Sequence, residues 1–239
     1  MKIDIISLFP NMFKGFLEES IIKRAIEKGV VEINVINPRP FANNKHHHVD
    51  DTPYGGGAGM VLQCEPLFKC FASIEKPCHT LIMTPQGTPY KQEIAKRLAK
   101  EEHLVIICGH YEGFDERIRT LADEQISIGD YVLTGGEIPS MAIADSIVRL
   151  LDGAITNESL GDSFYDGLLE YPQYTKPQEF EGMKVPDVLL SGNHEEIRKW
   201  RLKESLRNTY LNRPDLLENR DFTKEELKFL EEIKVEIEK

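Results

Sequence analysis

A short apolar run followed by glycine-rich loops limits this chain to few folds. Residues 104–108 read LVIIC, whose length and β-branched content predict a strand buried on both faces. Gly109 ends this strand, Thr84-Pro85-Gln86-Gly87 ends a similar one over 79–83, and glycines 129, 135 and 136 follow a third. Because the carboxyl ends of parallel strands meet at one edge of a sheet, we expect these loops to form one pocket.

Strand and helix patterns alternate through the first 150 residues. Apolar residues predict strands over 3–8 and 31–35, and helices over 12–17, 21–26, 66–74, 94–99 and 138–151. This order predicts an α/β domain with a mostly parallel sheet and helices on both faces. The last of these helices is apolar on more than one face, which predicts a subunit interface as well as a core.

The periodicity fails after Asp152, and a small helical domain is expected beyond about Pro177. We therefore predict a first domain over 1–153, a flexible linker over 154–177 and a small all-α domain over 178–239. Asn193 with Glu196, and Thr223 with Glu226, have the spacing of helix-capping pairs. The near-helical spacing of Trp200, Leu206 and Tyr210 predicts that they form the core of this domain rather than stack on bases.

Charge gives two opposed indications about partners. The 239-residue chain has a net charge of −11, which by itself argues against a polyanion. Residues 198–213, however, hold six basic side chains and one acidic one. We expect this segment, with Arg198, Lys199 and Arg201, to bind phosphates.

No signal peptide and no membrane-spanning run is evident, so a cytoplasmic location without membrane contact is expected. The four cysteines lack a Cys-x-x-Cys spacing, which favours buried thiols over a zinc site. His46-His47-His48 lies near Asp50-Asp51, but these residues offer no i, i+4 pair, so no metal site is predicted there.

The glycines do not match known nucleotide-binding fingerprints. The first strand ends in SLFP, without the G-x-G-x-x-G of a dinucleotide fold, and no Walker lysine follows the glycines at 55–59. A ligand pocket must therefore come from the later loops.

Three long motifs, DTPYGGGAGM (51–60), GHYEGFDER (109–117) and SIGDYVLTGGE (127–137), resemble those of the bacterial tRNA (guanine-N1)-methyltransferases. The similarity extends from IISLFP near the start to RPDLLEN at 213–219 and covers nearly all the chain. That family belongs to the SPOUT superfamily, so the resemblance implies a deep trefoil knot in the C-terminal part of the first domain. It also implies a homodimer with composite active sites.

The resemblance implies S-adenosylmethionine as methyl donor and magnesium as a possible assistant. The donor residues it implies are Met83, Thr84, Pro85, Gly109, Tyr111, Glu112, Gly113, Ile128, Gly129, Tyr131, Leu133, Gly135, Gly136 and Pro139. For the target guanine it implies the loop that holds Asp50, Gly55 and Gly59.

Two catalytic residues are also implied by the resemblance. Asp162, in an Asp-Ser-Phe motif, would take the proton from N1 of guanine, and Arg149 would stabilise charge on O6. From the residues alone, an Asx-turn aspartate and a helix-terminal arginine are the favoured interpretations, and the resemblance favours the catalytic roles instead. Gly161 and His110 depart from the family pattern. The histidine at position 110 would make activity more sensitive to pH.

The expected activity is methylation of tRNA at the guanosine 3′ of the anticodon, guanosine 37. A related SPOUT enzyme acting on ribosomal RNA is the first alternative. A non-catalytic RNA-binding protein using the basic segment is the second.

Overall fold

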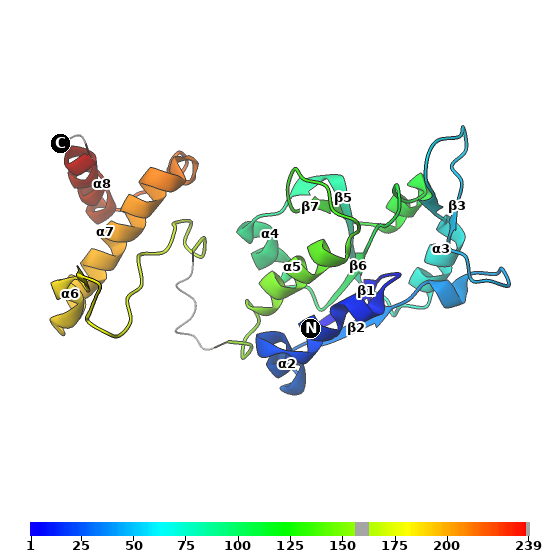
Figure 1. Ribbon diagram of the computed structural model, residues 1–239, viewed down its shortest axis with the longest axis horizontal. Helices are drawn as coiled ribbons and strands as arrows, with labels where there is room; N and C mark the ends of the chain where they lie inside the picture. Colours follow the sequence, from blue (N-terminus) through cyan, green and yellow to red (C-terminus); the bar gives the residue numbers. More distant parts are fainter. Residues whose placement is uncertain (156–162, 238–239) are drawn as a thin grey trace. The chain divides into compact units, whose positions relative to one another are not determined.

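The computed structural model describes residues 1–155 and 163–237, so Gly161 and Asp162 lie outside the described residues. The chain divides into two compact units, Met1–Thr156 (unit 1) and Asn157–Lys239 (unit 2) (Figure 1). The boundaries expected from the sequence stay a prediction.

Unit 1 is built on a five-stranded sheet in which every strand pair is parallel. The order is β2-β1-β6-β5-β7. The strands are β1 (Lys2–Ile6), β2 (Glu32–Ile36), β5 (His79–Pro89), β6 (His103–Ile107) and β7 (Glu124–Ser127). The expectation of an α/β fold with a mostly parallel sheet is confirmed.

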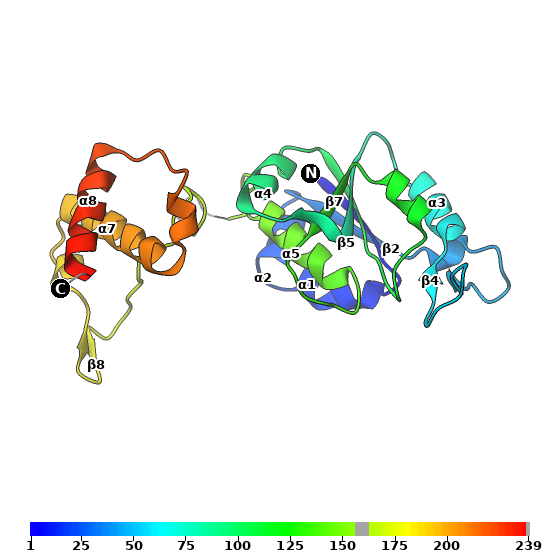
Figure 2. The same ribbon diagram turned by 90° about the horizontal axis from the view of Figure 1, so that it is seen from above.

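Helices cover both faces of the sheet, as Figures 1 and 2 show. One face packs against η1 (Pro10–Phe13), α1 (Lys14–Glu18), α2 (Ser20–Glu27), α4 (Gln92–Leu98) and α5 (Glu137–Val148). The other face packs against α3 (Cys64–Ala72) and η3 (Glu116–Leu121). Successive strand residues point to opposite faces, so a continuous apolar run such as β6 supplies both cores.

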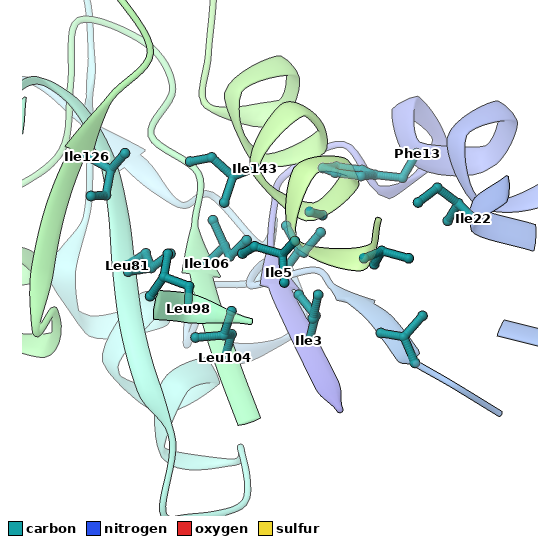
Figure 3. Close-up of a cluster of buried hydrophobic side chains, with 14 of the residues drawn as sticks. Ile3, Ile5, Phe13, Ile22, Leu81, Leu98, Leu104, Ile106, Ile126 and Ile143 are labelled. Carbon is teal, nitrogen blue, oxygen red and sulfur yellow. The ribbon is translucent and has the colours of Figure 1, made fainter. Parts of the chain in front are cut away.

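The larger core lies between the sheet and α5. Ile5 and Ile106, from neighbouring strands, lie side by side and face Ile143 of α5 (Figure 3). All three side chains are fully buried. Burying such a side chain contributes about 1.5–3 kcal/mol, so this packing holds α5 against the strands.

Strand β5 continues where the sequence predicted a loop. Leu81–Met83 pair with β7, the register then shifts, and Thr88 and Pro89 pair with β7 again. Residues 84–87 therefore bulge from a continuing strand rather than end it. An added Cβ on Gly87 would lie 2.4 Å from the backbone nitrogen of Ile126, so only glycine allows this approach.

Short elements fill the segment between β2 and α3. They are η2 (Arg39–Phe41), β3 (Asp50–Asp51) and β4 (Val61–Leu62), and β3 pairs antiparallel with β4. The Leu62 N–H donates to the carbonyl of Gly113 at 3.0 Å, which ties this segment to the loop after β6.

Unit 2 contains helices α6 (Asp187–Leu190), α7 (His194–Asn212), η5 (Pro214–Leu217) and α8 (Lys224–Ile237), and a hairpin of β8 (Glu179–Phe180) and β9 (Met183–Lys184). Both predicted caps form. Asn193 accepts from Glu196 N–H at 3.3 Å, and Thr223 and Glu226 bond reciprocally at 2.7 and 3.2 Å.

The core of unit 2 includes a residue from the predicted linker. Leu168 is buried with Leu206 of α7 and with Leu230 and Ile233 of α8. Tyr210 packs against this cluster as predicted. The prediction for Trp200 was wrong, because this half-buried ring lies outside the cluster and packs at a tilt against Tyr174, with 6.4 Å between centroids.

No described helix combines the length and the apolar character that a membrane crossing requires.

Candidate active site

The bulge within β5 and the loops after β6 and β7 enclose a cavity of about 320 Å³, here called the carboxyl-edge cavity. All fourteen residues expected to hold a methyl donor line it: Met83, Thr84, Pro85, Gly109, Tyr111, Glu112, Gly113, Ile128, Gly129, Tyr131, Leu133, Gly135, Gly136 and Pro139. Its volume lies within the range of small-molecule sites, about 300–1,000 Å³. The sequence therefore located one real cavity.

Six further lining residues were missed. They are His110, Phe114, Ile126, Ser127, Val132 and Thr134. Ile126 and Ser127 are the last residues of β7, His110, Val132 and Thr134 lie between predicted residues of the same loops, and Phe114 directly follows Gly113. Continuity along the loop was the signal that could have found them.

The wall formed by Gly135 and Gly136 is held by backbone contact. Gly136 N–H donates to the carbonyl of Gly109 at 2.8 Å. An added Cβ on Gly136 would lie 2.7 Å from Cα of Cys108 and 2.9 Å from N of Gly109. The loop before α5 is thus pressed onto the end of β6. Glycine is required at position 136 because the neighbouring backbone atoms cannot move aside for a side chain.

Replacing Gly136 by alanine is expected to lower the free energy of unfolding by about 1–3 kcal/mol, the usual cost of forcing an atom into a packed site. Gly15→Ala is the matched control. Gly15 lies exposed in α1 with no heavy atom within 4 Å of an added Cβ, and a helical alanine is more stable than glycine by about 1 kcal/mol. Urea unfolding followed by circular dichroism measures both, and equal midpoints would contradict the packing argument.

Tyr111 has a strained backbone in the wall of the cavity, with φ of 61° in a non-glycine residue. Burial raises the pKa of its phenol, the Arg39 guanidinium opposes that rise, and the Asp50 carboxylate adds to it. Arg39 Nη2 lies 3.5 Å from the Tyr111 oxygen. Strain of this kind is kept where surrounding contacts enforce it, and here they come from the segment between β2 and α3.

The predicted guanine loop reaches the rim of the cavity at two of its three residues. Asp50 faces Tyr111, and an added Cβ on Gly59 would lie 2.3 Å from Cγ of Glu112. Gly55 instead lies in an exposed turn, with no heavy atom within 4 Å of an added Cβ.

Arg149 does not join the cavity of its own chain. It follows the last residue of α5, whereas Pro139 lines the cavity in the first turn of that helix. Ten residues of helix separate the two positions by about 15 Å. The two predicted parts of the site are therefore held apart by a rigid element.

The predicted phosphate-binding residues are in unit 2, and two of them are already paired. Arg198 forms bidentate ion pairs with Glu195 and Glu225, and Lys199 bonds Glu196 at 3.0 Å. The Arg201 guanidinium instead lies over the ring of Tyr171, 4.9 Å from its centroid. Most of the basic segment is thus neutralised by nearby carboxylates; Lys203 and Arg207 also pair with Glu236.

Two of the four free thiols, those of Cys70 and Cys108, are buried. Burial raises the pKa of Cys70 to about 12 and raises that of Cys108 as well. Among the residues that the structure describes, no group of three or more His, Cys, Asp or Glu side chains could hold a metal ion.

A parallel sheet with a glycine-lined cavity at its carboxyl edge defines unit 1 as a small-molecule-binding α/β domain. The model of the family described as tRNA (Guanine-1)-methyltransferase TrmD matches residues 1–219. Three curated bacterial relatives bear the name tRNA (guanine-N(1)-)-methyltransferase. The protein of Dictyoglomus turgidum is 55% identical over 240 residues, covering 99% of this chain and 98% of the relative. The proteins of Anoxybacillus flavithermus and Geobacillus kaustophilus are 56% and 57% identical, covering 98% and 97% of this chain and 98% of each relative.

The chain therefore belongs to the tRNA (Guanine-1)-methyltransferase family, and the expectation of a methyltransferase is confirmed.

Proposed function

We propose that this protein transfers the methyl group of S-adenosylmethionine to N1 of guanosine 37 in tRNA, directly 3′ of the anticodon. The observation that carries the proposal is the convergence of all fourteen expected donor residues on the carboxyl-edge cavity in a chain of this family. Such a substrate would also place the protein in the cytoplasm.

The cavity suits the proposed donor chemically. Backbone N–H and C=O groups at the glycine loops can bond to adenine edges, while Tyr111 and Tyr131 offer aromatic walls. Glu112 adds a carboxylate for the cationic end of the ligand. When bound, S-adenosylmethionine supplies an activated methyl group on a positively charged sulfur.

We further propose that the chain forms the trefoil knot of the SPOUT fold and that unit 2 serves as the small helical RNA-binding domain. Membership of the family supports the knot, and the packing of Gly136 onto Cys108 and Gly109 is compatible with it, because the segment before α5 presses directly on the end of β6. Domains over 1–153 and 178–239 with a linker over 154–177 remain part of this proposal.

The proposed chemistry needs two groups from the chain. N1 of guanine carries a proton that must leave, and Asp162 is proposed as the base that accepts it. As negative charge develops on O6, Arg149 is proposed to donate a hydrogen bond to that oxygen. Magnesium is also proposed to assist the methyl transfer. Since the described residues offer no cluster for it, substrate oxygens would have to supply most of its ligands.

The separation along α5 supports a homodimer with composite sites. A helix cannot bring Arg149 and Pro139 of one chain to the same ligand, so we propose that each site combines the cavity of one subunit with Arg149 and Asp162 of the other. Val132 and Ile138, which are 97% and 50% exposed beside the cavity, provide apolar surface for this contact.

The proposed activity is tested by incubating the protein with methyl-labelled donor and total tRNA, then locating the label by nucleoside analysis. We expect N1-methylguanosine at position 37. Ribosomal RNA transcripts compete in a parallel reaction, and preferential labelling of those transcripts would favour the ribosomal alternative. Absence of transfer to either RNA would favour a non-catalytic RNA-binding protein.

Arg201 is expected to contribute more to tRNA affinity than Lys199 does. Each substitution to alanine removes one positive charge, but Lys199 is already bonded to Glu196 whereas Arg201 lies over Tyr171. Arg201→Ala should weaken binding and lower the slope of log affinity against log salt by about one unit, the effect of one lost phosphate contact. Lys199→Ala is the charge-matched control and should change the slope less. Equal slopes in the two variants would show that only overall charge matters.

A further inference from the structure

A carboxylate that does not line the carboxyl-edge cavity is buried directly behind its wall. Glu137, the first residue of α5, is 2% exposed. One carboxylate oxygen accepts a hydrogen bond from the Ser7 hydroxyl at 2.7 Å, and Ser7 is 1% exposed. The Ser7 oxygen in turn accepts from Phe9 N–H at 3.0 Å, which fixes its direction.

The second carboxylate oxygen faces a histidine of the cavity wall. Glu137 Oε2 lies 3.7 Å from Nδ1 of His110. This nitrogen is buried and has no hydrogen-bond partner among the described residues. The imidazole is held by Phe9 and Tyr111, whose ring centroids lie 4.6 and 5.2 Å away. A small inward movement of the wall would convert the 3.7 Å approach into a hydrogen bond.

Gly135 lies between the carboxylate and the imidazole. An added Cβ there would be 2.3 Å from Glu137 Oε2 and 2.6 Å from His110 Nδ1. The next residue, Gly136, donates to the carbonyl of Gly109. Ser7, Glu137 and His110, here called the Glu137 cluster, thus connect the segment after β1 with both loops that form this wall.

A buried carboxylate is costly unless its oxygens are satisfied. The Ser7 hydroxyl and the N-terminus of α5 stabilise one carboxylate oxygen, and the His110 imidazole faces the other oxygen at 3.7 Å. Substrate-assisted closure commonly tightens such long contacts, because hydrogen bonds in a ligand-free site are often longer than in the complex. A small shift of the wall would therefore turn the 3.7 Å approach between Glu137 and His110 into a hydrogen bond and satisfy the His110 nitrogen.

We propose that the Glu137 cluster is a positioning device for the methyl donor, in which Glu137 and His110 bond when the Gly109–His110 and Gly135–Gly136 walls close on it. The proposal rests on the proposed function, because it requires the donor to occupy the carboxyl-edge cavity. Glu137 itself touches neither donor nor guanine, so it acts through the loops and is not a catalytic residue.

The test is Glu137→Gln, which keeps the shape of the side chain but removes its charge. Calorimetric titration with S-adenosylmethionine should give a dissociation constant about 10-fold to 100-fold weaker than that of the unchanged protein, the usual effect of losing a charged hydrogen bond. In steady-state assays KM for the donor should rise by a similar factor. The KM for tRNA and kcat at saturating donor should change less than about threefold, because the reacting groups are untouched.

Asp4→Asn is the matched control. Asp4 is also 2% exposed and bonds His103 at 2.8 Å and Asn34 at 3.0 Å, but it lies in β1 away from the three loops of the cavity. Its replacement should lower the thermal unfolding midpoint without changing the donor dissociation constant. If Glu137 has only a structural role, Glu137→Gln should likewise reduce the folded fraction and the binding stoichiometry. The affinity of the folded protein for the donor would then stay unchanged.

Ser7→Ala and His110→Asn keep the proposal testable if Glu137→Gln folds poorly. Each should weaken donor binding. Combining Ser7→Ala with His110→Asn should cost less than the sum of the single effects, because both act through one carboxylate. If the unchanged protein does not bind the donor, both the proposed function and the positioning role are overturned. If it binds, and folded Glu137→Gln and Ser7→Ala bind equally tightly, only the positioning role is overturned.

Discussion

Replacing Asp162 by asparagine is expected to lower the rate of single-turnover methyl transfer by about two to four orders of magnitude, the contribution typical of a general base. Asparagine keeps the size and polarity of the side chain but cannot accept the N1 proton. Donor binding should hardly change, because Asp162 lies outside the three glycine-loop segments of the sequence. The measurement is methyl transfer with saturating tRNA, beside calorimetric binding of the donor.

Asp152→Asn is the control for the loss of one negative charge, since Asp152 is an exposed aspartate that follows α5 in the sequence. It should transfer methyl at the unchanged rate. A near-normal rate for Asp162→Asn would exclude Asp162 as the base, and so would a loss of donor affinity in proportion to the rate. The role would then pass to another carboxylate near the guanine, and Asp50, which faces Tyr111 at the rim, is the next candidate.

A heterodimer made from two inactive variants is expected to recover about half the activity of the unchanged dimer. One subunit carries Gly113→Val, and the other carries Asp162→Asn. Gly113 has φ of 134° and no heavy atom within 4 Å of an added Cβ, so valine strains the loop and adds bulk at the cavity without meeting another residue. If the cavity of one subunit works with the base of its partner, one of the two sites in this heterodimer is intact.

The two subunits can be given different affinity tags, co-expressed and purified through both tags. Each homodimer should be inactive, and the heterodimer should bind one donor per dimer. A folded heterodimer that binds donor but transfers no methyl would show that each site lies within one chain. An active monomer in sedimentation at assay concentrations would contradict the composite site altogether.

The sequence predicted the α/β framework of unit 1 because local patterns determine it. Continuous apolar runs such as residues 104–107 are typical of strands buried on both faces in a parallel sheet, and the glycines that follow such strands lie at the carboxyl edge of that sheet. One physical rule therefore located β6, the loops after β6 and β7, and the cavity together. The same reasoning failed at residues 84–87, because their continuation as a strand depends on a register shift against β7 that no local pattern encodes.

Tertiary contacts also explain what was missed among the charged residues. The carboxylate that neutralises Arg198 from α8 is Glu225, 27 positions further along the chain, so a local charge count made the segment appear more basic than it is. Glu137 looked like an ordinary helix-starting acid. Its burial depends on Ser7, 130 positions away, which no helix pattern can show.

The glycine wall of the carboxyl-edge cavity has a consequence for how inhibitors could be designed. A protein commonly escapes an inhibitor by substituting a residue that touches it, but a side chain at Gly136 would meet backbone atoms of Cys108 and Gly109. Such a substitution damages the fold before it can repel the compound, since backbone atoms cannot rotate aside as a flexible side chain does. An inhibitor that bonds to main-chain groups along Gly109 and Gly136 should therefore meet few single-residue escape routes, whereas one that depends on the exposed ring of Tyr131 should lose potency quickly.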